Sequence, residues 1–183
     1  MRQIVRKLFF DFEKEELFLN NMSANGLALS KYSWGKYVFD EAAKGEYIYR
    51  LELLEHPIDS MESQNYIQFM KETGAELVTT YHRWAYFRKK ASDGDFNIYS
   101  DIDSRLKHYE RIRILFLAVI GFNFFAGFFN LFVGNLHKSS GYPAINIYVG
   151  IISFTLVTLL LIFLLLPLTK KIGQLRSEKQ IRE

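Results

Sequence analysis

Apolar side chains follow two different patterns along this chain of 183 residues. In the first hundred residues they recur at helical spacing or alternate with polar residues, as in amphipathic helices and half-buried strands. Beyond residue 113 they form two long runs. Asp, Glu, Lys and Arg are absent from Ile114 to Leu136 and remain scarce as far as Lys170. The pattern therefore predicts a soluble part followed by a membrane part.

The soluble part, residues 1–104, is predicted to be an α+β domain. Between Asp11 and Asn25 the apolar residues have helical spacing, and Gly26 stands where a left-handed residue ends a helix. Alternation of apolar and polar residues then predicts antiparallel strands as far as Leu53.

The same order of elements returns in the second half of this domain. A helix is predicted at residues 61–73, Gly74 ends it, and strands follow, the last at Phe96–Tyr99. With an extra strand at Ile4–Phe10, we predict a tandem α-β-β(-β) duplication that forms one antiparallel sheet with two helices on one face. The alternative is a chance likeness, because helix, glycine and strand often follow one another.

Two segments, 114–133 and 148–168, are apolar over the roughly 20 residues that a helix needs to cross a bilayer. They are predicted to form a transmembrane hairpin with an external loop at 134–147. Residues 105–113 are a predicted juxtamembrane helix, and residues 169–183 a basic cytoplasmic tail. Core helices of a soluble protein are the alternative, but the rest of the chain is too small to cover both.

Positive charges flank the apolar segments. Arg111 and Arg113 precede the first, Lys170 and Lys171 follow the second, and Lys138 alone lies between them. Short cytoplasmic flanks collect Lys and Arg, so we expect a multi-pass protein of the cell membrane with both termini in the cytoplasm. The four flanking residues are expected to anchor the helices at the bilayer surface.

Four small or amide residues of the first apolar segment recur at helical spacing: Asn123, Gly127, Asn130 and Gly134. Such a stripe lets helices approach closely, which predicts a packing seam against the second segment or against another copy of the chain. A ligand or ion path is the alternative, disfavoured because neither segment contains an ionisable residue.

Catalytic chemistry is not expected from the sequence. The chain has no cysteine, and its four histidines lie in different elements without zinc-site spacing. Glu13, Glu15 and Glu16 lie in the first turns of a helix, where the helix dipole favours carboxylates. Phosphate-binding loops and nucleophile motifs are absent. We therefore expect no enzyme activity, no metal and no cofactor.

A nucleic-acid partner is not expected either, because the net charge of +3 is small and its basic excess lies mostly beside the apolar segments. Five aromatic residues of the predicted strands form a possible pocket or partner surface: Trp34, Tyr47, Tyr49, Trp84 and Tyr86. Core packing is the alternative, since aromatic residues are common in sheet cores.

Four stretches carry a resemblance: Phe10–Glu16, Leu19–Gly26, Gly45–Arg50 and Trp84–Lys89. They resemble the bacterial membrane-protein family catalogued as domain of unknown function 2812, over nearly the whole soluble part. The resemblance implies C-terminal membrane spans and no particular activity. The family often has Trp after the glycine that ends each helix, where this chain has Leu27 and Ala75.

Members of that family are often encoded beside PadR-like transcriptional regulators, which implies a part in membrane or drug-stress responses. We therefore expect a membrane-anchored cytoplasmic sensory or regulatory module that binds a protein partner, such as a PadR-like regulator. The alternative is an accessory subunit of a membrane transport or envelope-stress complex.

Overall fold

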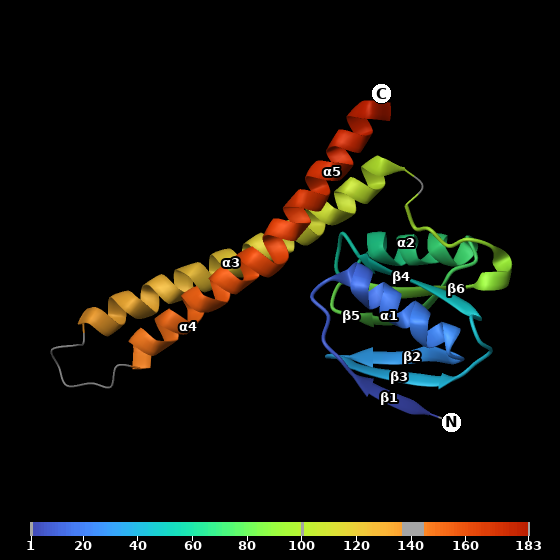
Figure 1. The fold of residues 1–183 in the computed structure, drawn as a ribbon, viewed down its shortest axis with the longest axis horizontal. Helices are drawn as coiled ribbons and strands as arrows, with labels where there is room; N and C mark the ends of the chain where they lie inside the picture. The colour runs from blue at the N-terminus through green and yellow to red at the C-terminus, as the bar shows by residue number, and fades with distance from the viewer. Residues whose placement is uncertain (1, 100, 137–144, 183) are drawn as a thin grey trace. The chain divides into compact units, whose positions relative to one another are not determined.

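The computed structural model describes residues 2–99, 101–136 and 145–182. The chain divides into two compact units, Met1–Ser100 and Asp101–Glu183 (Figure 1). The first unit holds the strands and two helices, and the second is entirely helical in its described part.

The first unit is an α+β domain, as predicted. Its elements are, in chain order, β1 (Gln3–Arg6), α1 (Phe12–Ala24), β2 (Leu27–Ser33), β3 (Lys36–Glu41), β4 (Tyr47–Leu53), α2 (Met61–Glu72), β5 (Glu76–Tyr81), β6 (Trp84–Lys90) and the short 3₁₀ helix η1 (Ala91–Asp93).

These strands form two three-stranded antiparallel sheets, ordered β1-β3-β2 and β4-β6-β5. The prediction of one sheet was wrong in this respect. Edge strands β2 and β5 contact one another, but each carries a bulge, between Leu29 and Lys31 and between Leu77 and Thr79. A bulge interrupts the regular row of N–H and C=O groups and increases strand twist, which explains why no ladder joins the two strands.

The repeat is a strand-helix-strand-strand unit rather than one that begins with a helix. β4, which the sequence assigned to the first half, pairs with β6 and is the first element of the second repeat. Gly26 and Gly74 follow α1 and α2 with φ of +84° and +87°. The bulges of β2 and β5 also fall at corresponding positions, so the two repeats within the first unit share topology and local irregularity.

The predicted last strand, Phe96–Tyr99, is not a strand. Phe96 is buried in a core with α2, and Ile98 packs against the same core. The alternation of apolar residues therefore reflects the packing of Phe96 and Ile98 against this core, without strand pairing. The predicted first strand is also shorter than Ile4–Phe10, because β1 ends at Arg6.

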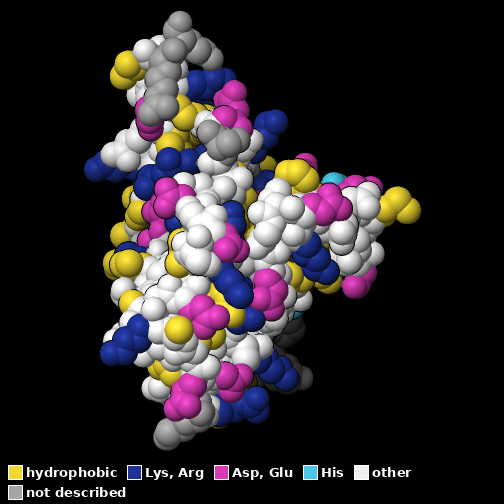
Figure 2. Space-filling model, turned by 90° about the vertical axis from the view of Figure 1, so that its right-hand side faces the viewer, with side chains coloured by type: hydrophobic (Ala, Val, Ile, Leu, Met, Phe, Trp, Pro, Cys, Tyr) yellow, Lys and Arg dark blue, Asp and Glu magenta, His cyan; other side chains and the backbone are white. Residues whose placement is uncertain are grey.

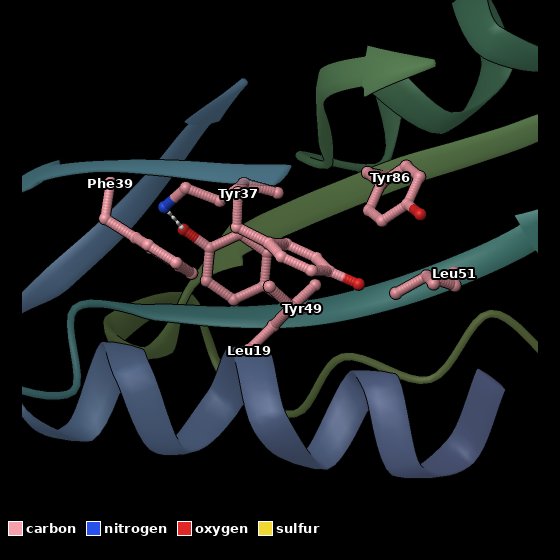
Figure 3. Packing of buried hydrophobic residues seen from close by; sticks show 7 residues of the cluster. Leu19, Tyr37, Phe39, Tyr49, Leu51 and Tyr86 are labelled. Carbon is pink, nitrogen blue, oxygen red and sulfur yellow. Dashed lines mark hydrogen bonds between the residues drawn. The ribbon is translucent and has the colours of Figure 1, made fainter. Parts of the chain in front are cut away.

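Two hydrophobic cores hold the domain together. The first contains Leu19 of α1 and Tyr86 of β6 together with residues of β2, β3 and β4 (Figure 3). The second contains Ile67 of α2 and Phe87 of β6. Successive residues of a strand point to opposite faces, so β6 separates the two cores. The two helices serve different cores, instead of covering one face as predicted.

The second unit consists of two long helical stretches. α3 (Ile102–Leu136) is the first, and α4 (Ile145–Leu160), a π-helical turn η3 (Leu161–Leu165) and α5 (Leu166–Arg182) form the second. Both stretches are long and apolar enough to cross a membrane. The predicted loop is shorter than 134–147, because its ends are helical, and residues 137–144 lie outside the described residues.

Each helical stretch is longer than a bilayer requires. The 35 residues of α3 extend about 52 Å, whereas the hydrocarbon core of a bilayer is about 30 Å thick. The charged residues at the start of α3 belong to the same uninterrupted helix as the apolar segment that follows them. In the other stretch, Pro167 lacks an amide hydrogen, which accounts for the π-helical turn immediately before it.

Candidate functional site

An open pocket of about 470 Å³ lies where β2 and β5 meet. Ser30 and Val78, the extra residues of the two bulges, both line it. The pocket therefore arises from the same irregularity that keeps the two sheets apart. Its lining residues are Ala28, Leu29, Ser30, Asp40, Glu41, Ala42, Glu46, Tyr47, Glu76, Val78 and Arg88.

Arg88 is held firmly inside this pocket. Its Nε and Nη2 atoms donate to the two carboxylate oxygens of Glu76 over 2.8 and 2.9 Å. The guanidinium lies 4.2 Å from the ring centroid of Tyr47, and Nη1 donates to the Leu29 carbonyl over 3.4 Å. A bidentate pair that also stacks on an aromatic ring has little freedom, so Arg88 fixes the shape of the pocket.

The remaining charge of the pocket is acidic. A hydrogen bond from Arg2 lowers the pKa of Asp40, and the backbone N–H of Ala43 lowers that of Glu46. With Glu41 and Glu76 the pocket holds four carboxylates, of which Asp40 is paired with Arg2 and Glu76 with Arg88, so an acidic excess remains. It suits a cationic group of a ligand or partner. Among the described residues no cluster of His, Asp and Glu is arranged to hold a metal ion.

A second group of polar side chains lies in the first core. The hydroxyls of Tyr37 on β3 and Tyr86 on β6 donate to the same Glu15 oxygen over 2.6 and 2.8 Å. Burial raises the pKa of Glu15, while these two hydrogen bonds lower it. The Tyr32 ring lies 4.7 and 4.9 Å from the rings of Tyr37 and Tyr86. Glu15 thus connects α1 to both sheets.

The neighbouring stripe of α1 covers the free edge of β4. Asn20 accepts from the Tyr49 amide over 2.8 Å and donates to its carbonyl over 3.2 Å. Ser23 makes the same two bonds with Tyr47, and Glu16 accepts from the Leu51 amide over 2.8 Å. These side chains satisfy alternate backbone groups, as a neighbouring strand would.

Sequence analysis missed both arrangements. It explained the acidic run of α1 by the helix dipole, which remains adequate for the exposed Glu13. Glu15 and Glu16 instead point into the protein. Buried Glu is rare without partners, and the Tyr hydroxyls that pair with Glu15 come from strands far along the chain. No local pattern contains that information.

Four of the five predicted aromatic residues lie in or against the first core, and Trp34 does not. Tyr47 lines the acidic pocket, whereas Tyr49 and Tyr86 are buried in the first core. Trp84 is half-buried, with its ring 6.0 Å from that of Phe12. Trp34 is 76% exposed at the turn between β2 and β3. They are therefore not brought together as one surface.

The glycines of the predicted seam contact the second helical stretch. A Cβ on Gly127 would lie 3.1 Å from Ser153 and 3.2 Å from Phe154, and one on Gly134 would lie 2.7 Å from Ile147. The amides of Asn123 and Asn130 are half-buried. Their Nδ2 atoms donate to carbonyls one turn earlier in α3, those of Val119 and Ala126.

At the charged end of the helices, ion pairs join α3 to α5. Arg176 and Glu110 are 2.6 Å apart, and Lys179 and Asp103 are 2.7 Å apart. Of the four predicted surface anchors, Lys170 is exposed, and three are half-buried: Arg111, Arg113 and Lys171. The Lys171 ammonium lies 6.0 Å from the Tyr109 ring centroid.

Charge of both signs covers the face of the molecule drawn in Figure 2. Lys and Arg side chains alternate there with Asp and Glu side chains. A nucleic-acid interface usually gathers Lys and Arg on one face or stripe. This face carries no such stripe.

A family model described as "Protein of unknown function (DUF2812)" matches residues 11–120. The match includes every element from α1 to β6 and the first part of α3, which is more than half of the chain. No curated protein and no solved structure matches the sequence. The family resemblance of the sequence is confirmed, and the chain belongs to the DUF2812 family.

Proposed function

We propose that this protein is a non-catalytic regulatory module, anchored in the cell membrane, whose cytoplasmic α+β domain binds a protein partner. Two apolar helices of sufficient length support the anchoring. Lys and Arg are in excess before the first apolar segment and after the second, which supports cytoplasmic termini and a multi-pass arrangement.

The proposal of partner binding rests on the acidic pocket at the bulges of β2 and β5. Arg88 and Glu76 hold its wall rigid, and Asp40, Glu41 and Glu46 supply negative charge. A DNA-binding regulator presents a basic surface, which complements such a pocket. A PadR-like regulator, the partner class that the family resemblance implies, has the required chemistry.

Affinity purification of the tagged full-length protein from detergent-solubilised native membranes tests this proposal, with mass spectrometry of the recovered proteins. Glu41→Lys reverses one charge of the pocket. Glu72→Lys, on the exposed end of α2, makes the same change elsewhere. We expect the wild type and Glu72→Lys to recover a transcriptional regulator, and Glu41→Lys to lose it. Equal recovery by all three would refute the pocket as the binding surface.

An accessory subunit of a membrane transport or envelope-stress complex is the second candidate. It is supported by the half-buried amides of Asn123 and Asn130, whose described hydrogen bonds use only their Nδ2 atoms. Amide oxygens in a membrane favour hydrogen bonds across helices.

Asn130→Leu removes such an amide and its hydrogen bond to the Ala126 carbonyl. Gly127→Leu is unsuitable for this purpose, because its side chain would collide with Ser153 and Phe154 within the hairpin. Loss of a co-purifying transport protein with Asn130→Leu, but not with the lipid-facing change Phe129→Leu, favours the accessory role. Retention of that protein by both variants argues against the role.

A further inference from the structure

An exposed tryptophan stands at the turn between β2 and β3. Trp34 has a φ of +42° and Gly35 one of +67°, so both central residues of this turn are left-handed. Glycine and asparagine normally occupy such positions, and a bulky residue there is disfavoured. The Trp34 ring centroid lies 6.3 Å from that of Tyr81, yet Trp34 is 76% exposed, so this contact leaves most of its surface uncovered.

A second exposed apolar side chain lies beside this turn. The Lys7 amide donates to the Gly35 carbonyl over 2.8 Å, which brings the segment after β1 against the turn. A Cβ on Gly35 would lie 2.6 Å from a methyl carbon of Leu8, so Leu8 covers the glycine. Leu8 is itself 64% exposed. Trp34 and Leu8 therefore form a small apolar tip.

Positive charge surrounds the tip. Arg6 on β1 and Lys36 on β3 are direct partners in the ladder, so two like charges face each other on one side of the sheet. Such a pair is unfavourable in the folded domain. Both side chains are exposed, and neither forms an ion pair with any residue that the structure describes. An anionic partner would relieve this repulsion.

Aromatic side chains with an apolar body and polar edge concentrate at the boundary between water and lipid, and exposed Lys and Arg bind anionic head groups. The chain also carries two helices of membrane-spanning length, beginning at Ile102. A tether of this kind keeps the domain at high effective concentration near the bilayer. A lipid surface therefore matches the tip in charge, polarity and proximity.

We propose that Arg6, Leu8, Trp34 and Lys36 form a docking face with which the α+β domain binds the anionic surface of its own membrane. Trp34 and Leu8 enter the head-group region, while Arg6 and Lys36 contact lipid phosphates. This inference rests on the membrane anchoring of the proposed function and is independent of the acidic pocket. Docking would make the accessibility of the domain to partners depend on the charge of the bilayer.

Tryptophan fluorescence tests the proposal, because the chain has only Trp34 and Trp84. Trp84→Phe leaves Trp34 as the only reporter. The full-length variant is placed in nanodiscs of zwitterionic lipid, with or without anionic lipid, and quenching by lipids brominated in the acyl chain is measured. We expect quenching of Trp34 in anionic nanodiscs that high salt reverses. The reverse reporter, Trp34→Phe, leaves the half-buried Trp84, for which we expect no quenching.

Charge reversal provides the decisive comparison. In the Trp84→Phe background, Arg6→Glu is combined with Lys36→Glu. For each of the two positive side chains replaced, the ratio of docked to free domain should fall at least about fivefold. Lys44→Glu with Lys71→Glu changes the net charge equally at exposed positions elsewhere, and should leave quenching unaltered. Absent quenching, or quenching indifferent to salt and to Arg6 and Lys36, overturns the proposal.

Failure of the helices to insert is recognised separately, by extraction of the protein from native membranes with alkaline carbonate. In that event the same quenching is measured after the Trp84→Phe protein is added to vesicles of the two lipid compositions. Docking is thereby tested whether or not the anchoring part of the proposed function holds.

Discussion

Three carboxylates of the first unit are buried or nearly so, which is unusual in a domain of about a hundred residues. Glu15 binds two tyrosine hydroxyls, Glu16 binds the Leu51 amide, and Glu52 accepts a hydrogen bond from Tyr99. Burial of a carboxylate favours its neutral form unless hydrogen bonds compensate. The pKa values of Glu15 and Glu16 are raised by burial, so the titration of these two carboxylates is coupled to folding.

Stability should fall as the pH rises towards neutrality. Burial raises the pKa of Glu16 to about 7, although the Leu51 amide and Arg50 lower it. Between the ordinary value of 4.5 and this value, the folded chain holds a proton that the unfolded chain has released, so the free energy of unfolding decreases with rising pH. Burial also raises the pKa of Glu15, so Glu15 makes the free energy of unfolding depend on pH in the same direction.

Glu16→Gln should remove part of this dependence, because the amide oxygen still accepts from Leu51 without carrying a charge. We expect the loss of unfolding free energy between pH 5 and pH 8 to be about 1–3 kcal/mol smaller than in the wild type. Urea unfolding of the detergent-solubilised protein, followed by tryptophan fluorescence, measures it. If the free energy of unfolding depends on pH equally in both proteins, Glu16 has the same pKa in the folded and unfolded states, which would contradict the prediction.

Tyr86→Phe should destabilise the first core. It removes one of the two donors to the Glu15 oxygen and leaves the ring in place, at an expected cost of about 1–3 kcal/mol. Tyr37→Phe removes the other donor. Because both hydroxyls bind one oxygen, their effects should not add, which a double-mutant cycle of thermal unfolding detects. Strict additivity would contradict the shared site.

At the scale of elements, α1 takes the place of a strand beside β4. Sheet edges are prone to pair with other chains, and covering them with a helix is one natural solution. The stripe Glu16, Asn20 and Ser23 provides hydrogen bonds to three alternate residues of β4. The corresponding stripe of α2 makes no such set among the described residues, where Gln64 binds Ile58 and Gln68 binds Glu72.

Asn20→Leu should uncover the edge, since leucine is branched at Cγ like asparagine but cannot bind the Tyr49 amide and carbonyl. We expect faster hydrogen exchange in a peptide spanning residues 47–51 and a loss of about 2–4 kcal/mol in unfolding free energy. Asn21→Leu, on the exposed side of the same helix, is the matched control. Unchanged exchange in Asn20→Leu would show that packing alone holds α1.

Contact between the long helices depends on glycine at one position and not at another. Gly127→Leu should separate α3 from α4, because even a Cβ would lie 3.1 Å from Ser153. At Gly121 a Cβ would meet no described non-neighbouring atom within 4 Å. We expect a lower melting temperature in detergent for Gly127→Leu and little change for Gly121→Leu. Similar melting of both variants would refute the close approach.

At the scale of the whole molecule, one chain contains a folded domain and a pair of apolar helices. The two units differ in where their apolar side chains lie. The first unit buries aromatic residues away from water. The second exposes large apolar side chains along most of its length, such as Phe122 and Phe163. Exposed apolar surface of this extent is typical of segments that contact lipid or another protein.

Absence of cysteine allows a direct test of topology. Ser139→Cys lies between the apolar segments, and Ser177→Cys lies after them. In intact cells a membrane-impermeant maleimide should label only Ser139→Cys, with Ser177→Cys labelled after permeabilisation. Labelling of Ser177→Cys in intact cells would contradict cytoplasmic termini.

The sequence by itself determined the helices of this protein. Periodic apolar residues predict α1 and α2, glycine marks their ends, and uninterrupted apolar runs predict the long helices, because these signals are local to each segment. The stripe through Gly127 and Gly134 is likewise a helical repeat, visible without a partner helix.

Only the tertiary structure decided how the elements combine. The division into two sheets, the phase of the repeat and the pocket at Ser30 and Val78 depend on bulges and strand pairing. The partners of Glu15 lie 22 and 71 residues away along the chain. Hydrogen bonding between distant segments leaves no periodic trace in the sequence, so a buried carboxylate and an exposed one look alike until the chain is folded.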